Sequence, residues 1–172
     1  DFYFDRFNKD FETTSLIRQT VASYAIIKRM PKPFNLTLCS IDPGCRVHKA
    51  LAAVQAHNWK GVCICERHAA SLFAKDHVIM LSPDAHCVLE RLDENKVYVI
   101  GAMVDNFRMM RTTLDEANVR GHRCARLPVP EVLGAKVDPV LNIDTVIQIM
   151  AVFHETGSWR QALQAVPARK RR

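Results

Sequence analysis

The chain has 172 residues, of which 48% are apolar and 24% are charged, and its formal net charge is +6. This is the size and the composition of about one globular domain, and it excludes a disordered, collagen-like or coiled-coil chain. No apolar run approaches the roughly 20 residues that a membrane-spanning helix needs. Six irregularly spaced cysteines are too few for a disulfide framework and favour a reducing compartment.

Strand-like and helix-like patterns alternate along the whole chain. Short apolar or alternating runs predict strands, and apolar residues three or four positions apart predict helices. In chain order we expect a strand over 1–5, a helix over 13–29, a strand over 34–41, a helix through 47–54, strands over 62–65 and 77–81, a short helix through 88–92, a strand over 96–101, a helix over 114–120, a strand over 123–127 ended by 128–130, and helices over 142–157 and 158–167. The expected helix caps are Asp42, Asn142, Ser158, the capping box of Thr113 with Glu116, and the stops Gly121 and Gly157.

This alternation predicts an α/β domain with a mostly parallel sheet flanked by helices. No repeat or linker interrupts it, so we expect a single domain over 1–172 with a basic tail at 167–172. The opening DFYFD already reads as the inside of a strand, so we expect an N-terminal region to precede it. The lack of a targeting segment therefore indicates nothing about the compartment.

The positive charge is concentrated in two segments. Residues 106–126 carry a net +3 and residues 159–172 carry +5, which leaves −2 for the rest of the chain. A phosphate backbone is the commonest polyanion that such concentrations serve, although a solvated basic face with a frayed tail explains the charge equally well. The candidate RNA-binding residues are Lys28, Arg29, Arg108, Arg111, Arg123, Arg169, Lys170, Arg171 and Arg172.

Ligands of parallel sheets bind at the carboxyl ends of the strands, which here are residues 82–84, 101–105 and 128–130. Asp105 is the sole carboxylate between Glu94 and Asp115, and it follows a strand end, where a general base can be placed. A cap or turn role is the commoner use of such an aspartate.

Cys63, Cys65 and His68, with His57 upstream, also deserve comparison with a metal site. Zinc sites use Cys-x-x-Cys pairs rather than a Cys-x-Cys pair inside a strand. We therefore interpret these cysteines as reduced and buried, and we predict no metal.

Three stretches in a fixed order, KVYVIGAMVD, CARLPVPEVL and LNIDTVIQIMAVFHETGSWRQALQAVPARKRR, resemble the SPOUT-class tRNA methyltransferases that modify N1 of the purine at tRNA position nine. DFYFD and PFNLTL near the start are also similar to this family, so the resemblance covers essentially the whole chain. The closing GSWRQALQAVPARKRR is most similar to the branch that serves as the methyltransferase subunit of mitochondrial ribonuclease P.

The resemblance implies a C-terminal trefoil knot that holds S-adenosylmethionine. It identifies Asp105 as the catalytic aspartate, which would take the proton that guanine carries on N1, and Gln19 as a hydrogen-bonding partner of the target base. No metal is implied, because a sulfonium is already an activated leaving group. The implied cofactor pocket consists of Leu81, Ser82, Pro83, Ile100, Gly101, Ala102, Met103, Thr113, Leu127, Pro128, Val129, Leu141, Asn142, Ile143 and Val146.

The function implied is methylation of guanine, adenine or both at position nine of tRNAs in the mitochondrial matrix, by a monomeric domain without membrane contact. The implied partners are tRNA and pre-tRNA, a short-chain dehydrogenase subunit and a metallonuclease subunit of ribonuclease P. Two alternatives stay open: a non-catalytic RNA-binding scaffold that holds S-adenosylmethionine as a structural ligand, and a SPOUT enzyme that acts on another RNA position.

Overall fold

The structure is a computed structural model and describes residues 1–104 and 111–171. The described strands form two parallel sheets, so the predicted α/β class is confirmed, although two sheets stand where one was expected. The first sheet has the order β1-β2 and the second the order β4-β3-β5. The strands are β1 (Leu36–Leu38), β2 (Val62–Ile64), β3 (Val78–Leu81), β4 (Val97–Ile100) and β5 (Arg123–Ala125).

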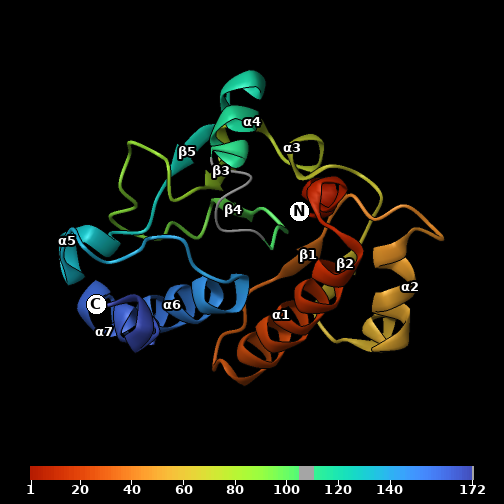
Figure 1. The fold of residues 1–172 in the computed structure, drawn as a ribbon, viewed down its shortest axis with the longest axis horizontal. Helices are drawn as coiled ribbons and strands as arrows, with labels where there is room; N and C mark the ends of the chain where they lie inside the picture. The colour runs from red at the N-terminus through yellow and green to blue at the C-terminus, as the bar shows by residue number, and fades with distance from the viewer. Residues whose placement is uncertain (105–110, 172) are drawn as a thin grey trace.

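Helices surround the two sheets (Figure 1). Helices α1 and α6 lie side by side, α2 lies beyond β2, and α4 lies beside β3 and β5. Among the described residues, no helix combines the length and the apolar character needed to cross a membrane. The helices are η1 (Phe2–Phe7), α1 (Asp10–Arg29), α2 (Arg46–Ala53), η2 (Ala56–Asn58), α3 (Ala69–Leu72), η3 (Lys75–His77), α4 (Thr112–Arg120), α5 (Val129–Leu133), α6 (Ile143–Thr156), α7 (Trp159–Ala162), η4 (Leu163–Ala165) and η5 (Ala168–Lys170).

The α1–α6 contact is apolar. Ile27 and Met30 of the α1 end pack against Ile147 and Ala151 of α6, and all four are buried. The α6 pair is spaced by one helical turn, as the predicted apolar stripe requires. This contact fixes α6, and with it the segment that leads into α6, against the first part of the chain.

Several predicted helix ends are confirmed. Gly121 and Gly157 end α4 and α6, each with a φ of +66°. This left-handed conformation is open to glycine because it has no Cβ. The hydroxyl of Ser158 caps α7 by accepting from the backbone N–H of Gln161.

Some predicted helix starts are wrong. Helix α1 begins at Asp10, where Glu12 accepts from the backbone N–H of Lys9, because a carboxylate at that position satisfies a free donor. The expected box of Thr113 and Glu116 does not form, because α4 begins two residues earlier than expected, at Thr112, which places Thr113 inside the helix. Two other predicted caps also differ. Cys45, and not Asp42, caps the start of α2, and the side chain of Asn142 makes no hydrogen bond at the start of α6.

Two segments differ in type from the prediction. A strand was expected over 1–5, but the chain forms the 3-10 helix η1 from Phe2 onward. The helix expected through 88–92 is absent, since Val88 forms a parallel bridge with Arg126 and Leu89 donates to the Arg126 carbonyl at 2.8 Å. The backbone of this segment therefore pairs with the residue that follows β5. Residues 128–130 open α5, where proline is favoured because the first helical N–H groups have no partner.

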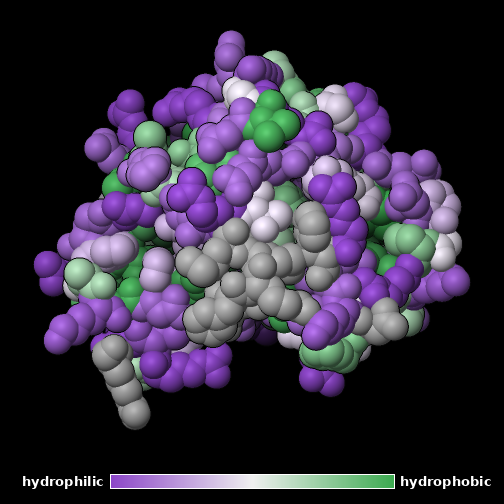
Figure 2. All heavy atoms as spheres, turned by 45° about the horizontal axis from the view of Figure 1, so that its top comes forward, coloured by the Kyte–Doolittle hydropathy of each residue, from purple (hydrophilic) through white to green (hydrophobic). Residues whose placement is uncertain are grey.

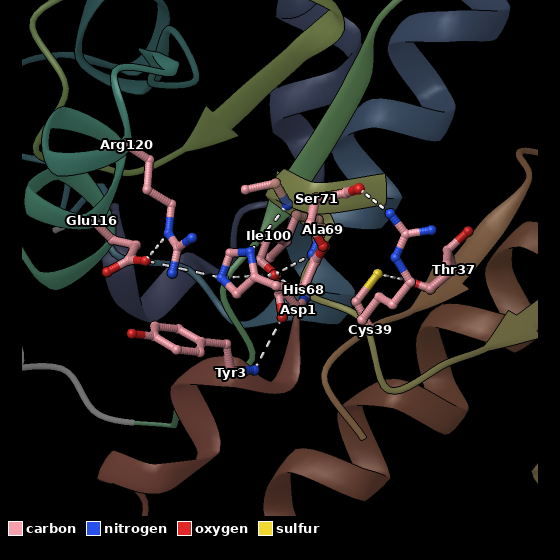
Figure 3. A network of polar contacts seen from close by, with 12 residues as sticks. Asp1, Tyr3, Thr37, Cys39, His68, Ala69, Ser71, Ile100, Glu116 and Arg120 are labelled. Carbon is pink, nitrogen blue, oxygen red and sulfur yellow. Dashed lines mark hydrogen bonds and ion pairs between the residues drawn. The ribbon is translucent and has the colours of Figure 1, made fainter. Parts of the chain in front are cut away.

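A buried polar network ties η1 to α3 (Figure 3). The Asp1 carboxylate accepts from the backbone N–H of Tyr3 at 3.0 Å and from that of Ala69 at 3.1 Å. Nδ1 of His68 accepts from the Ala70 N–H at 3.0 Å and so caps α3. Nε2 of His68 lies 3.4 Å from Asp1 Oδ2, at contact distance but without the geometry of a hydrogen bond.

The same histidine faces α4. Its Nε2 lies 4.0 Å from Oε1 of Glu116, and Glu116 in turn forms an ion pair with Arg120. The imidazole side chain is only 13% exposed. Burial first, and then the charge of Arg120, lower the pKa of His68 from 6.5 to about 4, while the charge of Glu116 acts in the opposite direction. His68 is therefore neutral at pH 7.

We expect His68 to make stability depend on pH. The unfolded chain takes up a proton near pH 6.5 that the folded chain takes up only near pH 4, so stability falls as the pH drops through this window. In urea titrations, the free energy of unfolding of the wild type should fall by about 2 kcal/mol more between pH 7 and pH 5 than that of His68→Asn. Asparagine keeps a cap acceptor and does not titrate. If the free energy of unfolding depended on pH equally in both proteins, His68 would not be the group that makes stability depend on pH.

Candidate functional site

The carboxyl ends of β3, β4 and β5 meet at one sheet edge. Leu81, the last residue of β3, pairs with Ile100 on one side and with Ala125 on the other. The three parallel strands therefore end level with one another, and the segments that follow them leave the sheet together. This places the described parts of the three predicted ligand segments, 82–84, 101–104 and 128–130, at the edge where open parallel sheets bind ligands.

An apolar cluster joins these segments to the start of α6. Its buried members include Leu81, Leu127 and Val129. Ile100, Leu141 and Val146 are partly buried and pack against them. Six of the predicted pocket residues, taken from four separate stretches of sequence, thus share one cluster.

Gly101 is placed where no side chain fits freely. A Cβ on Gly101 would lie 3.0 Å from Oγ1 of Thr113, 3.2 Å from Cδ2 of Phe4 and 3.4 Å from Cε of Met103. Thr113 comes from α4 and is 5% exposed. The structure therefore brings together Gly101, Met103 and Thr113, three residues of the predicted cofactor pocket. Ala102, also buried, belongs to a second cluster against which Ile143 packs.

The segment after β3 is held by main-chain and side-chain hydrogen bonds. Ser82 is buried, and its N–H donates to the Ala125 carbonyl at 3.0 Å. Asp84 accepts from the backbone N–H of Arg111 at 2.9 Å, which ties this segment to the start of α4. Sequence reasoning placed Asp84 in a ligand segment but gave it no role. Pro83 is exposed, whereas Pro128 is buried.

Gln19 links α1 to the same edge. Its side chain is 9% exposed, its Oε1 accepts from the backbone N–H of Ile143 at 2.9 Å, and its Nε2 donates to the hydroxyl of Ser15 at 3.3 Å. Gln19 thereby supplies the N-terminal cap of α6 that was expected from the exposed Asn142. The sequence pattern could show that Gln19 lies on a buried helix face and needs a hydrogen-bond partner. It could not show that this partner is the backbone of Ile143.

The candidate general base and part of the basic set lie outside the described residues. Asp105 and Arg108 fall in 105–110, and Arg172 is the last residue of the chain. Their predicted roles stay predictions.

The described basic residues are distributed around the molecule. Lys28 and Arg29 end α1, Arg123 starts β5, and Arg111 pairs with Asp115 at 3.9 Å. The α1 end, β5 and the C-terminus lie on different sides (Figure 1). One face of the molecule is mostly hydrophilic, with hydrophobic side chains scattered over it (Figure 2).

Two residues of the basic tail contact the body of the protein. Nζ of Lys170 lies 2.7 Å from Oδ2 of Asp138. Arg171 donates to the carbonyl of Val166 at 2.8 Å, at the end of η4. These contacts order the tail, so the picture of a frayed tail is wrong for both residues. Arg169 is exposed.

The cysteines differ in burial from the prediction. Cys63 in β2 is exposed and Cys65 just after β2 is half-buried, whereas Cys39 is buried. Burial raises the pKa of the Cys39 thiol to about 12, which makes it a poor nucleophile. Within 1–104 and 111–171, no group of three or more His, Cys, Asp or Glu side chains is placed to hold a metal ion.

The chain is similar to a known protein family over nearly its whole length. A family model described as tRNA (guanine(9)-N(1))-methyltransferase TRM10/TRM10A matches residues 1–171. The tRNA methyltransferase 10 homolog C of Homo sapiens is 28% identical over 173 residues, which are 99% of this chain and 43% of that protein. The homolog A of Rattus norvegicus is 36% identical over 114 residues, 66% of this chain and 34% of that protein. The chain thus spans less than half the length of these relatives.

Solved structures are similar over nearly the whole chain. Full-length spTrm10 in complex with SAH has a TM-score of 0.89 and 26% identity, over 98% of this chain and 91% of that one. A Trm10 from Thermococcus kodakaraensis, described as dual specific, has a TM-score of 0.73 over 97% of both chains. At 16% identity, the second match supports the fold alone.

We expect Gly101→Ala to destabilise the site through steric overlap. The new methyl group must displace Thr113 or Phe4, and such overpacking costs roughly 1–3 kcal/mol. Urea unfolding of Gly101→Ala, Thr113→Ala and the double variant forms a double-mutant cycle. Removal of Oγ1 should relieve part of the cost, so that the effects are not additive. If the two changes in unfolding free energy added within about 0.3 kcal/mol, the Thr113 side chain would not be what excludes a methyl group at position 101.

Proposed function

Because the chain belongs to the TRM10/TRM10A family of tRNA (guanine(9)-N(1))-methyltransferases, we propose that it transfers a methyl group from S-adenosylmethionine to N1 of the purine at position nine of tRNA. The observation that carries this proposal is the common edge at which β3, β4 and β5 end. The similarity to spTrm10 with SAH supports it, since S-adenosylhomocysteine is what S-adenosylmethionine becomes after methyl transfer.

The residues at this edge fit S-adenosylmethionine. Leu141, which packs on the buried Leu127 and Val129, is the partly exposed apolar side chain available to the adenine, and the strand ends offer backbone N–H and C=O groups. The missing side chain at Gly101 allows Thr113, Phe4 and Met103 to pack closely against the backbone of the segment that follows β4. When bound, the cofactor supplies a methyl group on a sulfonium, which needs no metal for activation. We propose that the chain around this pocket threads as a trefoil knot.

Asp105 and Gln19 are our candidates for the chemistry of the target base. Asp105 accepts the N1 proton of guanine, which adenine lacks, so the aspartate matters more for guanine. Positioning of the base in line with the methyl group supplies the remaining acceleration. Gln19 contributes here by holding the start of α6 in place through Ile143, and the same carboxamide is the candidate contact to the base.

We propose that the protein acts in the mitochondrial matrix within ribonuclease P. The support is the likeness of residues 157–172 to the branch of the family that serves this enzyme, and the whole-chain match to homolog C. Its partners would be pre-tRNA, a short-chain dehydrogenase subunit that supports methylation, and a metallonuclease subunit that cuts the 5′ leader.

Methyl transfer from labelled S-adenosylmethionine tests the enzyme proposal. We expect the full-length protein, with and without the dehydrogenase subunit, to label tRNA transcripts that carry guanine or adenine at position nine. Asp105→Asn should reduce guanine labelling by about 10²- to 10⁴-fold and leave tRNA binding unchanged. Asp42→Asn, an exposed loop carboxylate, is the matched control.

Each other outcome has a definite meaning. Undiminished labelling by Asp105→Asn would remove Asp105 from the chemistry. Normal tRNA binding without label on either transcript would replace the enzyme proposal by that of an RNA-binding scaffold. Label at another nucleotide would show a SPOUT enzyme with a different target position.

The basic tail is tested by the salt dependence of tRNA binding. We expect alanines at Arg169, Lys170, Arg171 and Arg172 to weaken binding and to flatten the plot of log affinity against log salt, because fewer counterions are released. Lys49→Ala in α2 is the control from outside the two basic segments. Arg171→Ala alone should lower stability, since Arg171 holds the end of η4. Unchanged affinity and slope in the fourfold variant would show that the tail does not bind tRNA.

A further inference from the structure

The segment that follows β4 belongs to no helix or strand. Residues 101–104 continue from the end of β4, and buried main-chain groups in such a segment need hydrogen-bond partners from elsewhere. The Ala102 N–H donates to Asp1 O at 2.9 Å. The Ala102 carbonyl and the Val104 N–H bond to no main-chain group of the described residues. The course of this segment therefore depends on a side chain.

That side chain is Asn8. Its residue ends η1, and η1 lies beside the carboxyl end of β4 (Figure 1). Asn8 Nδ2 donates to the Ala102 carbonyl at 3.2 Å, and Asn8 Oδ1 accepts from the Val104 N–H at 3.1 Å. A carboxamide has the donor and the acceptor of a peptide group. It therefore brackets Met103 in the way that one residue of a parallel neighbouring strand does.

The carboxamide of Asn8 is buried, and its hydrogen bonds select one orientation. Asn8 is 8% exposed, and its Nδ2 also donates to Asp5 Oδ1 at 3.2 Å. Both N–H donors and the oxygen acceptor thus have partners. If nitrogen and oxygen were exchanged, the oxygen would face the Ala102 carbonyl and the Asp5 carboxylate, which are both acceptors. Without the carboxamide, two buried main-chain groups of the segment lose their partner.

Helix α2 supports Asn8 from behind. Arg46 begins α2, and its Nη2 lies 3.0 Å from Oδ2 of Asp5 and 3.3 Å from the Asn8 carbonyl, to which it donates. The Asn8 N–H donates to Asp5 O at 2.8 Å and closes η1. The backbone of Asn8 and the carboxylate beside its side chain are therefore both fixed, and the carboxamide cannot move without breaking these contacts.

The segment that Asn8 holds is part of the proposed site. Ala102 is buried, and Val104 and Ile143 of the α6 start pack against its cluster. In the sequence, Val104 is followed by Asp105, the candidate general base. Catalysis by positioning is sensitive to such a support, since a misplacement of about 1 Å can cost roughly 10²-fold in rate.

We infer that Asn8 is a positioning residue of the methyl-transfer site. It acts through the main chain of Ala102 and Val104, whose course it sets, and not by contact with the cofactor or the purine. The inference rests on the proposed function. A residue that only joined η1 to α1 would need its backbone alone, whereas the side chain of Asn8 makes two hydrogen bonds to a segment more than ninety positions away.

Steady-state kinetics of the full-length protein with Asn8→Leu test the inference. Leucine is similar in shape to asparagine but makes none of the three hydrogen bonds. We expect kcat at saturating S-adenosylmethionine and tRNA to fall by about 10- to 100-fold, because the segment is displaced. The KM for tRNA should stay within about threefold, because the phosphate contacts that hold tRNA lie elsewhere.

Two variants serve as controls. Asn58→Leu makes the same substitution at an exposed position of η2 and should leave kcat unchanged. Val78→Ala removes buried apolar atoms at the start of β3, the end of the strand away from the site, and so lowers stability without touching the segment. All variants are compared at the same folded fraction, measured by circular dichroism.

Asn8→Asp tests the bond to Ala102 separately. Its ionised carboxylate still accepts from the Val104 N–H but repels the Ala102 carbonyl, whereas the protonated form donates to that carbonyl. Burial and the facing Asp5 carboxylate raise the pKa of the new carboxyl, and Arg46 behind Asp5 acts in the opposite direction. We expect kcat of Asn8→Asp, relative to wild type, to rise at least about threefold from pH 8 to pH 6. The same ratio for Asn58→Asp should stay constant.

Every other result overturns the inference. Equal kcat in Asn8→Leu and Asn58→Leu would do so, as would a loss no larger than that of Val78→Ala. A raised KM for tRNA with unchanged kcat would make Asn8 an RNA contact, and a constant pH ratio for Asn8→Asp would remove the bond to Ala102 from the mechanism. These outcomes, with an active wild type, leave the proposed function intact. A wild type that labels neither transcript overturns the proposed function and the role of Asn8 together.

Discussion

The two-sided pairing of Leu81 is the constraint on which the site depends. Because β3 pairs in parallel with both β4 and β5, and all three end at the level of Leu81, the segments that follow them leave the sheet at one edge. A shift of one residue in either pairing would turn a strand's side chains to the other face. The apolar cluster around Leu127 and Val129 fixes this register, since it contains residues that follow different strands.

Polar side chains from distant parts of the sequence then hold the segments at this edge. Gln19 of α1 caps α6 at Ile143, and Asp84 of the segment after β3 accepts from Arg111 at the start of α4. Asp1 and His68 tie η1 to α3 and face α4. Each bond satisfies a backbone donor at a helix end, where donors lack partners within the helix. The loops of the site are therefore held in place by side-chain acceptors from other parts of the chain.

The basic residues fall into two groups in the folded chain, those that bond to the protein itself and those that are exposed. Lys170 and Arg171 are used to attach the tail to Asp138 and to the end of η4, whereas Arg169 and Arg123 are exposed. A basic run in sequence therefore divides into structural and available cations once its neighbours are known. The exposed cations remain available to contact a polyanion, and they lie on different sides of the molecule.

The sequence by itself determined the α/β class, the parallel strands, the stops at Gly121 and Gly157 and the strand-end segments that leave the sheet at one edge. These follow from local patterns and from the chirality of the backbone. The tertiary structure decided what local patterns do not contain. It gave the cap of α6 to Gln19 rather than to Asn142, turned residues 88–92 into a partner of Arg126, and left Cys63 exposed. In the first two cases a backbone donor or a strand edge found its partner far away in sequence, and only the folded chain brings the two together.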